Sequence, residues 1–217
     1  MYGLPSHSPT LAEVSAPGSS HDNDRPILGD MTRLTAMTGA LLTIGTVLPM
    51  AAQRSTHEFE GHKFSLELPT GYQLQADASP QAGLKTFGFS TDARSDGTRG
   101  LIQVTLLDLS GAPQGQTVTL DRFAAAMLKG VSDRRSNWEQ TESELQIAGV
   151  RAKRIAWAGS REPGFGRPAV HMRGVMIAGI KKPLGFTLHT QDVAAYADAT
   201  LPLGEQALQT FALTLHR

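Results

Sequence analysis

Hydrophobic and polar positions alternate strictly in a short stretch near residue 65. Phe64, Leu66 and Leu68 are apolar, and the positions between them are polar. Since successive side chains of a β-strand point to opposite faces, this pattern predicts a strand over 63–68 with one buried face. The Pro-Thr-Gly sequence at 69–71 predicts a turn directly after it.

Two more strands are predicted before any helix. Residues 84–90 place Phe87 and Phe89 on one face, whereas residues 101–109 are apolar on both faces. An apolar run of that length is typical of a central strand that is covered on both sides. The polar, glycine-containing stretch 92–100 between them predicts a loop.

The strongest helical signal follows at 119–131. Apolar residues recur there at offsets of three and four, which places them on one stripe of a helix. The stripe consists of Leu120, Phe123, Ala124, Met127, Leu128 and Val131. Thr119 suits the N-cap, and the helix dipole favours Asp121 in the first turn. We expect the stripe to belong to the core rather than to a ligand site.

The rest of the chain predicts two hairpins and a closing helix. The first hairpin joins 144–147 to 150–157 through Ala148-Gly149, and residues 160–168 form a loop. The second hairpin joins 170–180 to 184–190, with 181–183 at its tip. The closing helix covers 203–213, with Leu208 and Phe211 pointing inward. Together these elements predict the α+β class, an antiparallel β-sheet sandwiched by helices.

An apolar segment at 31–52 has the pattern of a signal peptide. Arg33 precedes an apolar run, Pro49 ends it, and Ala51 and Ala52 suit a signal peptidase. The segment is short and polar for a membrane span, so we expect no stable span after processing. Residues 1–30 are then a disordered tail, or they precede a true start at Met31. An uncleaved anchor stays open if Met1 is the start.

The export segment leaves residues 53–217 as a single domain that is periplasmic or secreted. The whole chain carries 20 basic and 20 acidic residues, and removal of 1–52 leaves only a small positive excess. So weak a charge provides no field suited to nucleic acid or to an anionic membrane. The chain has no cysteine, which excludes disulfides, thiol catalysis and thiolate zinc sites. No cofactor is expected.

The order of these elements resembles a known superfamily. The segments that carry the resemblance are LELPTGY at 66–72, TLDRFAAAMLKGV at 119–131, IAGVRAKRIAW at 147–157 and LQTFAL at 208–213. They are similar to the PsbP-like superfamily, which includes the PsbP proteins of photosystem II, a Ran-binding nuclear protein and exported bacterial proteins of the DcrB and LpqN kind. The resemblance covers about residues 59–214 and implies a helix-covered antiparallel sheet in a binding or assembly factor. It transfers no functional residue, because fold alone does not specify function.

Four histidines are candidate metal ligands by position. His57 and His62 are five residues apart, whereas zinc-binding His-x-x-x-His motifs on a helix need an offset of four. In a strand an odd offset sends the two side chains to opposite faces, so we expect no zinc site there. His171 and His189 could meet across the second hairpin, as a surface pair or polar contact rather than as metal ligands.

The sequence contains no catalytic signature. No Gly-x-Ser-x-Gly nucleophile elbow occurs, and Ser160 lies in a stretch predicted to be a loop. No glycine-rich phosphate loop followed by Lys-Ser or Lys-Thr occurs either. We therefore predict that the protein is not an enzyme.

A basic cluster is the strongest surface feature of the sequence. It consists of Arg151, Lys153, Arg154, Lys181 and Lys182, with Trp157 beside them. Arg and Trp are enriched where proteins bind each other, so the cluster is a candidate patch for an acidic partner. The alternative is an ordinary solvated outer face.

Three hypotheses for function follow. The leading one is a non-enzymatic exported protein that binds a partner protein or assists assembly at the cell envelope. The first alternative is a small-ligand or metal-binding module with a pocket between the sheet and a helix. The second alternative is an unrecognised hydrolase, which requires a deep polar pocket.

Overall fold

Strands make up most of the chain that the computed structural model describes, which comprises residues 52–75, 83–111, 117–162 and 169–216. In chain order the strands are β1 (Gln53–Phe59), β2 (His62–Leu68), β3 (Gln73–Leu74), β4 (Leu84–Ser90), β5 (Leu101–Asp108), β6 (Arg135–Ile147), β7 (Val150–Arg161), β8 (Val170–Lys181), β9 (Leu184–Val193) and β10 (Ala212–Thr214). The helices in these ranges are α1 (Leu120–Ser132) and α2 (Ala194–Gln209).

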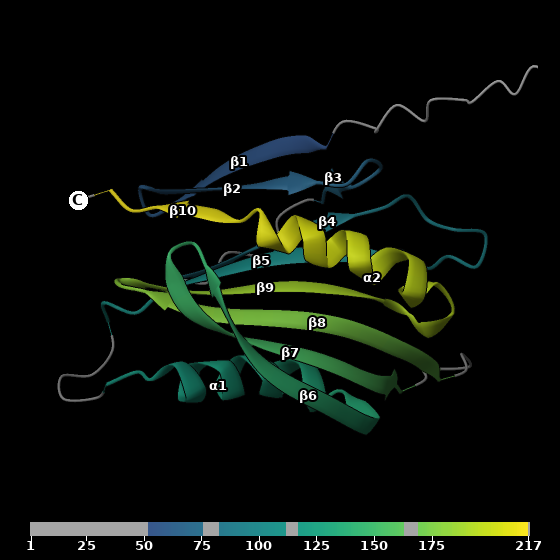
Figure 1. The fold of residues 1–217 in the computed structure, drawn as a ribbon. Helices are drawn as coiled ribbons and strands as arrows, with labels where there is room; N and C mark the ends of the chain where they lie inside the picture. Colours follow the sequence, from purple (N-terminus) through teal and green to yellow (C-terminus); the bar gives the residue numbers. More distant parts are fainter. Residues whose placement is uncertain (1–51, 76–82, 112–116, 163–168, 217) are drawn as a thin grey trace, which may run out of the picture. The chain divides into compact units, whose positions relative to one another are not determined.

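The strands form two antiparallel sheets (Figure 1). The larger sheet has seven strands in the order β3-β4-β5-β9-β8-β7-β6, and the smaller has three in the order β1-β2-β10. Strand β9 is inserted between β5 and β8, so neighbours in the large sheet come from distant parts of the chain. The predicted α+β class with an antiparallel sheet is confirmed.

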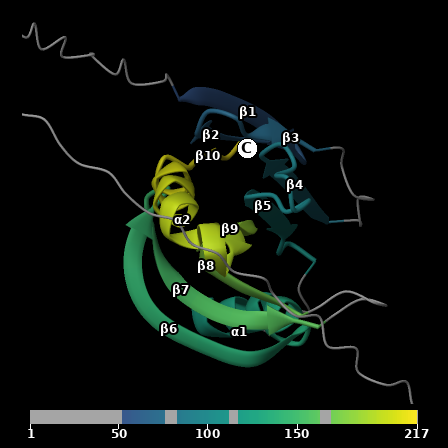
Figure 2. The same cartoon turned by 90° about the vertical axis from the view of Figure 1, so that its right-hand side faces the viewer.

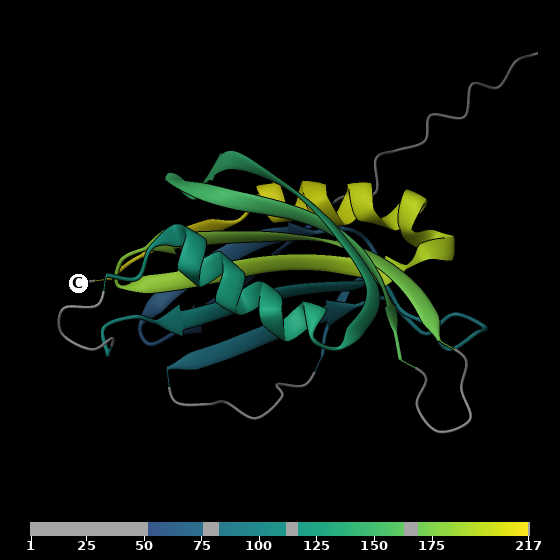
Figure 3. The same ribbon diagram turned by 90° about the horizontal axis from the view of Figure 1, so that it is seen from below.

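Helix α1 packs on one face of the large sheet (Figure 3). Its predicted stripe is confirmed, because Phe123, Ala124 and Leu128 are buried in a cluster with Met176 and Ala178 of β8. The predicted N-cap is also confirmed, since the Thr119 hydroxyl accepts a hydrogen bond from the backbone N–H of Arg122 at 3.4 Å. The helix therefore begins where capping chemistry and apolar spacing both place it.

The opposite face of the same strands packs on α2 and on the small sheet (Figure 2). Val175 and Ile177 alternate along β8 with the residues that meet α1, and they share a cluster with Leu208 of α2. Phe64 and Leu66 of β2 belong to that cluster too. Most of the buried apolar side chains lie in this cluster, so the main core lies between the large sheet and the layer formed by α2 with β1, β2 and β10.

Two hairpin turns use paired residues with positive φ. Ala148 and Gly149 have φ of 51° and 78°, the signature of a two-residue type I′ turn, and this turn was predicted. Glu60 and Gly61, with φ of 48° and 75°, form an equivalent turn between β1 and β2. The β1–β2 hairpin was not predicted, because residues 53–58 are mostly polar and exposed and so lack apolar alternation.

The predicted closing helix at 203–213 is wrong in its bounds. Helix α2 begins nine residues earlier, at Ala194, and ends at Gln209, after which β10 pairs with β2. A proline at 202 lies inside the helix and obscured its first half in the sequence pattern. The inward positions are confirmed, since Leu208 and Phe211 are 0% and 3% exposed.

The first predicted hairpin is also longer than the sequence indicated. Strand β6 extends back to Arg135. The sequence did not indicate this length, because most of the strand is exposed on both faces and shows no apolar period. Strand β7 continues to Arg161, so Ser160 lies in a strand and not in the predicted loop. Of the rest of that predicted loop, 163–168 lie outside the described residues.

The predicted tail and all of the predicted signal peptide except Ala52 lie outside the described residues. The residues that are described all belong to one compact unit. Neither of its helices α1 and α2 has the length and apolar character needed to cross a membrane. The predicted domain boundary at 53 and the cleavage of the segment before it stay predictions.

Candidate functional site

A cleft of about 740 Å³ crosses one end of the large sheet. Its lining comes from the ends of five neighbouring strands, β4, β5, β9, β8 and β7, and from the loop between β4 and β5. Gln75, directly after β3, and Glu162, directly after β7, complete it. The strand residues that line it include Ser90, Leu101, Gln191, Val193, Met172 and Arg161. A volume of this size is in the range of ligand-binding clefts.

The floor of the cleft is apolar and lies on the same sheet face as α1. Met172 is four residues before Met176 on β8, so both side chains project to the face that α1 covers. Leu101 and Val193 line the floor beside it and are only partly buried. Figure 3 shows that α1 covers only part of this face. The residues that line the cleft lie at strand ends on the uncovered part.

The loop that forms one wall is held by a buried ion pair. Arg94 donates to both carboxylate oxygens of Asp192, at 2.8 and 2.6 Å, and the Asp192 side chain is fully buried. The hydrogen bonds that Arg94 donates to Asp192 are the main reason that the pKa of Arg94 is raised. The Arg94 guanidinium also lies 4.2 Å from the ring centre of Tyr196. These contacts attach the loop to the junction of β9 and α2.

Within the same loop, Asp96 is engaged in local hydrogen bonds. Its carboxylate accepts from the Thr98 backbone N–H at 2.8 Å, from the Thr98 hydroxyl at 2.7 Å and from the Tyr196 hydroxyl at 3.0 Å. The two bonds from Thr98 are the main reason that the pKa of Asp96 lies below its usual range. Asp96 therefore shapes the wall and has few lone pairs left for a ligand.

The other end of the cleft is rich in arginine. Arg161 also lines an adjoining hollow of about 360 Å³, together with Arg134 and Arg135. Burial lowers the pKa of Arg135, and the positive charges of Arg161 and Arg134 lower it further. Asp133 in the same hollow is paired with Lys129 at 2.6 Å, and Glu162 is the other acidic residue of its lining. Positive charge is therefore in excess at this end of the cleft.

A packed aromatic group supports the arginine end from behind. The Trp157 ring stacks on Trp138 with 5.2 Å between ring centres, and Arg135 lies 4.4 Å above the same Trp157 ring. Trp157 Nε1 donates to His189 Nε2 at 3.0 Å. Burial lowers the pKa of His189 to about 3, so its imidazole is neutral and accepts this bond. Arg135 also donates to Gln191 Oε1 at 3.0 Å, which orients the amide in the cleft.

Hydrogen-bond donors are spread along the whole cleft. Ser90 is 4% exposed, and its hydroxyl is one of two side-chain groups in the described ranges that are buried without a hydrogen-bond partner. Gln191 uses its amide oxygen for Arg135, which leaves the amide nitrogen as a donor. Arg99 and Arg161 contribute guanidinium groups at the rim. The arrangement suits a ligand that offers acceptors and an apolar surface.

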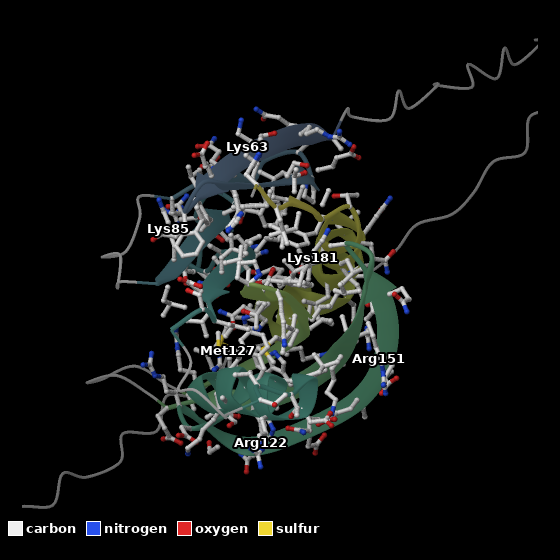
Figure 4. All side chains as sticks on the ribbon, turned by 90° about the vertical axis from the view of Figure 1, so that its left-hand side faces the viewer. Lys63, Lys85, Arg122, Met127, Arg151 and Lys181 are labelled. Carbon is white, nitrogen blue, oxygen red and sulfur yellow. The ribbon has the colours of Figure 1, made fainter. Side chains whose placement is uncertain are left out.

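The predicted basic patch is divided between different faces, and three of its members pair with acidic residues. Arg151 Nε donates to Glu144 at 2.7 Å on the outer side of the β6–β7 hairpin (Figure 4). On the α1 face, Lys153 Nζ lies 2.7 Å from Asp121 and also contacts Glu142. Arg154, the next residue along β7, therefore projects to the α2 face.

The remaining members of that patch differ in exposure. On the α2 face, Arg154 contacts Glu205 of α2 at 2.9 Å. Lys181 Nζ donates to the backbone carbonyls of Ala148 and Leu213, whereas Lys182 is exposed. Trp157 is only 4% exposed and so belongs to the core. As a docking surface for an acidic partner the cluster stays a prediction, with Arg151 and Lys182 as its exposed members.

The candidate histidine pairs do not meet in the structure. His57 in β1 is bonded to Ser55, and His62 in β2 accepts from the backbone N–H of His216. His171 is exposed and contacts Ser160, whereas His189 is buried on the other face, so the proposed contact across the hairpin is wrong. Across the described ranges, no group of three or more His, Asp or Glu residues is placed to hold a metal ion.

Sequence reasoning missed the cleft, although it identified the loop at 92–100 that forms one of its walls. Residues 92–100 and 160–168 were predicted as loops without a function, and Ser90, Gln191 and Arg99 were not singled out. The signal in the sequence was weak, because Arg99 and Arg161 lie close to predicted strands but nothing in the sequence brings the two together. The order β4-β5-β9-β8-β7 brings these positions together, and that order is not visible in the sequence.

Comparison with known proteins identifies the class of fold. The chain is similar to cyanobacterial PsbP (CyanoP) from Synechocystis sp. PCC 6803, with a TM-score of 0.51, 16% identity and coverage of 81% of this chain and 99% of that one. It is also similar to LpqN, which is involved in cell envelope biogenesis of Mycobacterium tuberculosis, with a TM-score of 0.49, 13% identity and coverage of 75% and 91%. No protein-family profile and no curated protein matches the sequence. The likeness to cyanobacterial PsbP confirms the predicted PsbP-like fold.

Proposed function

We propose that this chain is a non-enzymatic exported protein that binds a partner protein at the cell envelope, and that the cleft across β4, β5, β9, β8 and β7 is its binding site. The observation that carries this proposal is an open cleft with an apolar floor and an unpartnered buried hydroxyl, Ser90. Its walls are fixed by Arg94–Asp192 and by the stacked Trp157. A rigid, pre-formed cleft loses little entropy when a segment binds to it.

Two titratable groups in and behind the cleft support binding rather than catalysis, because they are already hydrogen-bonded to other side chains. Asp96 is already bonded to Thr98 and Tyr196, and the neutral His189 is bonded to Trp157 behind the arginine end. These groups stabilise the walls, and their protons are not presented to a ligand. The exported location is supported by the apolar segment at 31–52.

Retention of an envelope protein by the purified full chain tests the proposal. We expect a partner that is retained by the natural chain and by Arg122→Glu, a control on the exposed face of α1. The same partner must be lost with Arg99→Glu combined with Arg161→Glu, which reverses charge at both ends of the cleft. Equal retention of the partner by the control and by the double variant would refute the proposed function. Turnover of a substrate by the purified chain would refute it too.

A separate measurement tests export. Mass spectrometry of the native protein from fractionated cells should find an N-terminus close to residue 53 in the envelope or secreted fraction, because a signal peptidase removes its signal. An intact chain beginning at Met1 in the cytosol would contradict export. Binding in the cleft would be unaffected by that result.

A small-ligand module is a second candidate, supported by a hollow between β2 and α2. The hollow measures about 410 Å³ and is lined by Leu203, which is 52% exposed, together with Pro69 and Ala207. A ligand that binds only the folded chain raises its midpoint of thermal unfolding. A metabolite that raises the midpoint of the natural chain, but not of Leu203→Asp, would place the ligand in this hollow.

A further inference from the structure

The direction of the cleft indicates the shape of its ligand. The cleft runs across β4, β5, β9, β8 and β7, which corresponds to four strand-to-strand spacings. At about 4.8 Å for each spacing the cleft is about 19 Å long. An extended chain advances about 3.3 Å for each residue, so about six residues of a partner would fill it. An extended segment therefore matches the cleft better than a compact metabolite.

The positive charge at the Arg161 end of the cleft indicates which chemical group lies at the end of the bound segment. Arg134, Arg135 and Arg161 approach one another there, and the nearby Asp133 is paired with Lys129. Arg161 has no ion-pair partner in the described part of the chain. A guanidinium group binds a carboxylate through two parallel hydrogen bonds, which makes a carboxylate the matching group.

The donors along the rest of the cleft favour a polypeptide over a fatty acid. The buried Ser90 hydroxyl needs an acceptor, and its position on the cleft face of β4 follows from alternation with the core residue Phe89. The Gln191 amide nitrogen is a second donor between Ser90 and Arg161. Backbone carbonyls of an extended peptide provide acceptors at such intervals, whereas an alkyl chain provides none.

We propose that the cleft binds the C-terminal segment of a partner polypeptide, with the free carboxylate at Arg161 and apolar side chains over Leu101 and Met172. This inference rests on the proposed function and adds the identity of the bound segment. Asp96 is occupied by its own hydrogen bonds, but Glu162 stands beside Arg161 and repels an incoming carboxylate. Replacing Glu162 should therefore strengthen binding.

An array of short apolar peptides, each made with a free C-terminal carboxylate and as the C-terminal amide, tests the inference on the purified full chain. We expect the carboxylate form of the bound peptides to bind at least about tenfold more tightly than the amide, since a charge-assisted pair contributes about 1.5–3 kcal/mol. Arg161→Gln should abolish that difference, and Glu162→Gln should increase affinity. Arg122→Gln, on the exposed face of α1, is the matched control and should change neither.

The possible failures of this experiment are distinguishable. Equal binding of acids and amides would overturn carboxylate recognition and leave the partner-binding function standing. Binding of lauric acid in place of every peptide would overturn the polypeptide assignment. If no peptide binds and the envelope partner is retained by the cleft variants too, the proposed function fails together with this inference. Circular dichroism of each variant confirms that a loss of binding is not a loss of fold.

Discussion

At the scale of single residues, one buried carboxylate holds several parts of the chain. Asp192 receives hydrogen bonds from Arg94, from the backbone N–H of Val193 and from the hydroxyl of Thr200. Its side chain is completely buried, whereas that of Arg94 is 20% exposed. Removal of one partner of such an ion pair is strongly destabilising, because the other charge is then buried without a counter-ion.

We expect Asp192→Asn to lower the free energy of unfolding by about 2 kcal/mol or more, since the guanidinium of Arg94 loses its counter-ion. Urea unfolding measures the change. The matched control is Arg54→Gln, which breaks the exposed pair of Arg54 and Glu67 and should cost less than about 1 kcal/mol. Equal effects of the two substitutions would mean that the buried pair does not hold the loop.

A second residue-scale prediction concerns acid sensitivity. Burial lowers the pKa of His189 from 6.5 to about 3. Below pH 6.5 the unfolded chain therefore binds a proton that the folded chain does not, so stability falls as the pH falls toward about 3. The pKa of His57 is lowered as well, by burial and by Lys85, and acts in the same direction.

The free energy of unfolding, measured from pH 7 to about 4.5, should therefore decline less steeply for His189→Gln than for the natural chain, by up to about 1.4 kcal/mol for each pH unit. His171→Gln, at an exposed histidine, should keep the natural slope. Should the variant not fold, an NMR titration of the natural chain decides, because protonation of His189 above pH 5 would contradict the prediction.

At the scale of elements, the contact of α2 with β9 depends on a glycine. A Cβ at Gly204 would lie 2.1 Å from the Thr190 hydroxyl and 2.9 Å from its Cβ, and Thr190 is 1% exposed. Since real Cβ atoms do not approach so closely, Gly204→Ala must push α2 away from the sheet. The helix can lie this close only because that position has no side chain.

We expect Gly204→Ala to destabilise the fold by about 1–3 kcal/mol and Thr190→Ala to restore part of that loss in the double variant. Gly130→Ala in α1 is the matched control, because its Cβ would meet nothing within 4 Å. That control should raise stability by up to about 1 kcal/mol through helix propensity. Thermal unfolding of the four variants measures both effects, and purely additive losses would contradict the close contact.

Most element types were predictable, and the errors have a common cause. Strands with one buried face, such as β2 and β4, and the amphipathic α1 carry a periodic signal that reports which side faces the core. Strand β6 is exposed on both faces, and α2 is partly buried and contains Pro202. The apolar periodicity of both segments is therefore weak. The candidate cleft could not be predicted at all, because its residues are spread from Gln75 to Val193 in the chain.

At the scale of the whole molecule, Lys181 links the two sheets. Its ammonium group donates to the carbonyl of Ala148 in the β6–β7 turn at 3.0 Å and to that of Leu213 in β10 at 2.8 Å. The first carbonyl belongs to the large sheet's longest hairpin, and the second to the small sheet. A single cation therefore replaces water at two backbone acceptors and fixes the hairpin against β10.

Replacing Lys181 with Met should lower the free energy of unfolding by about 2 kcal/mol, because two charge-assisted hydrogen bonds are lost and only the aliphatic packing is kept. Lys182→Met, at the exposed neighbour, should change it by less than about 0.5 kcal/mol. Hydrogen exchange should show faster opening of β10 in the first variant only. Equal responses would assign both lysines to the solvated surface.

The sequence by itself determined the local features of this protein: the faces of the isolated strands, the limits of α1 and the turn at Ala148-Gly149. These follow from residue preferences over a few positions, which the chain order contains directly. The tertiary structure decided that β9 separates β5 from β8, that α2 shares a face with a second sheet, and that five strand ends meet in one cleft. Those arrangements depend on contacts between distant residues, whose partners periodicity does not specify.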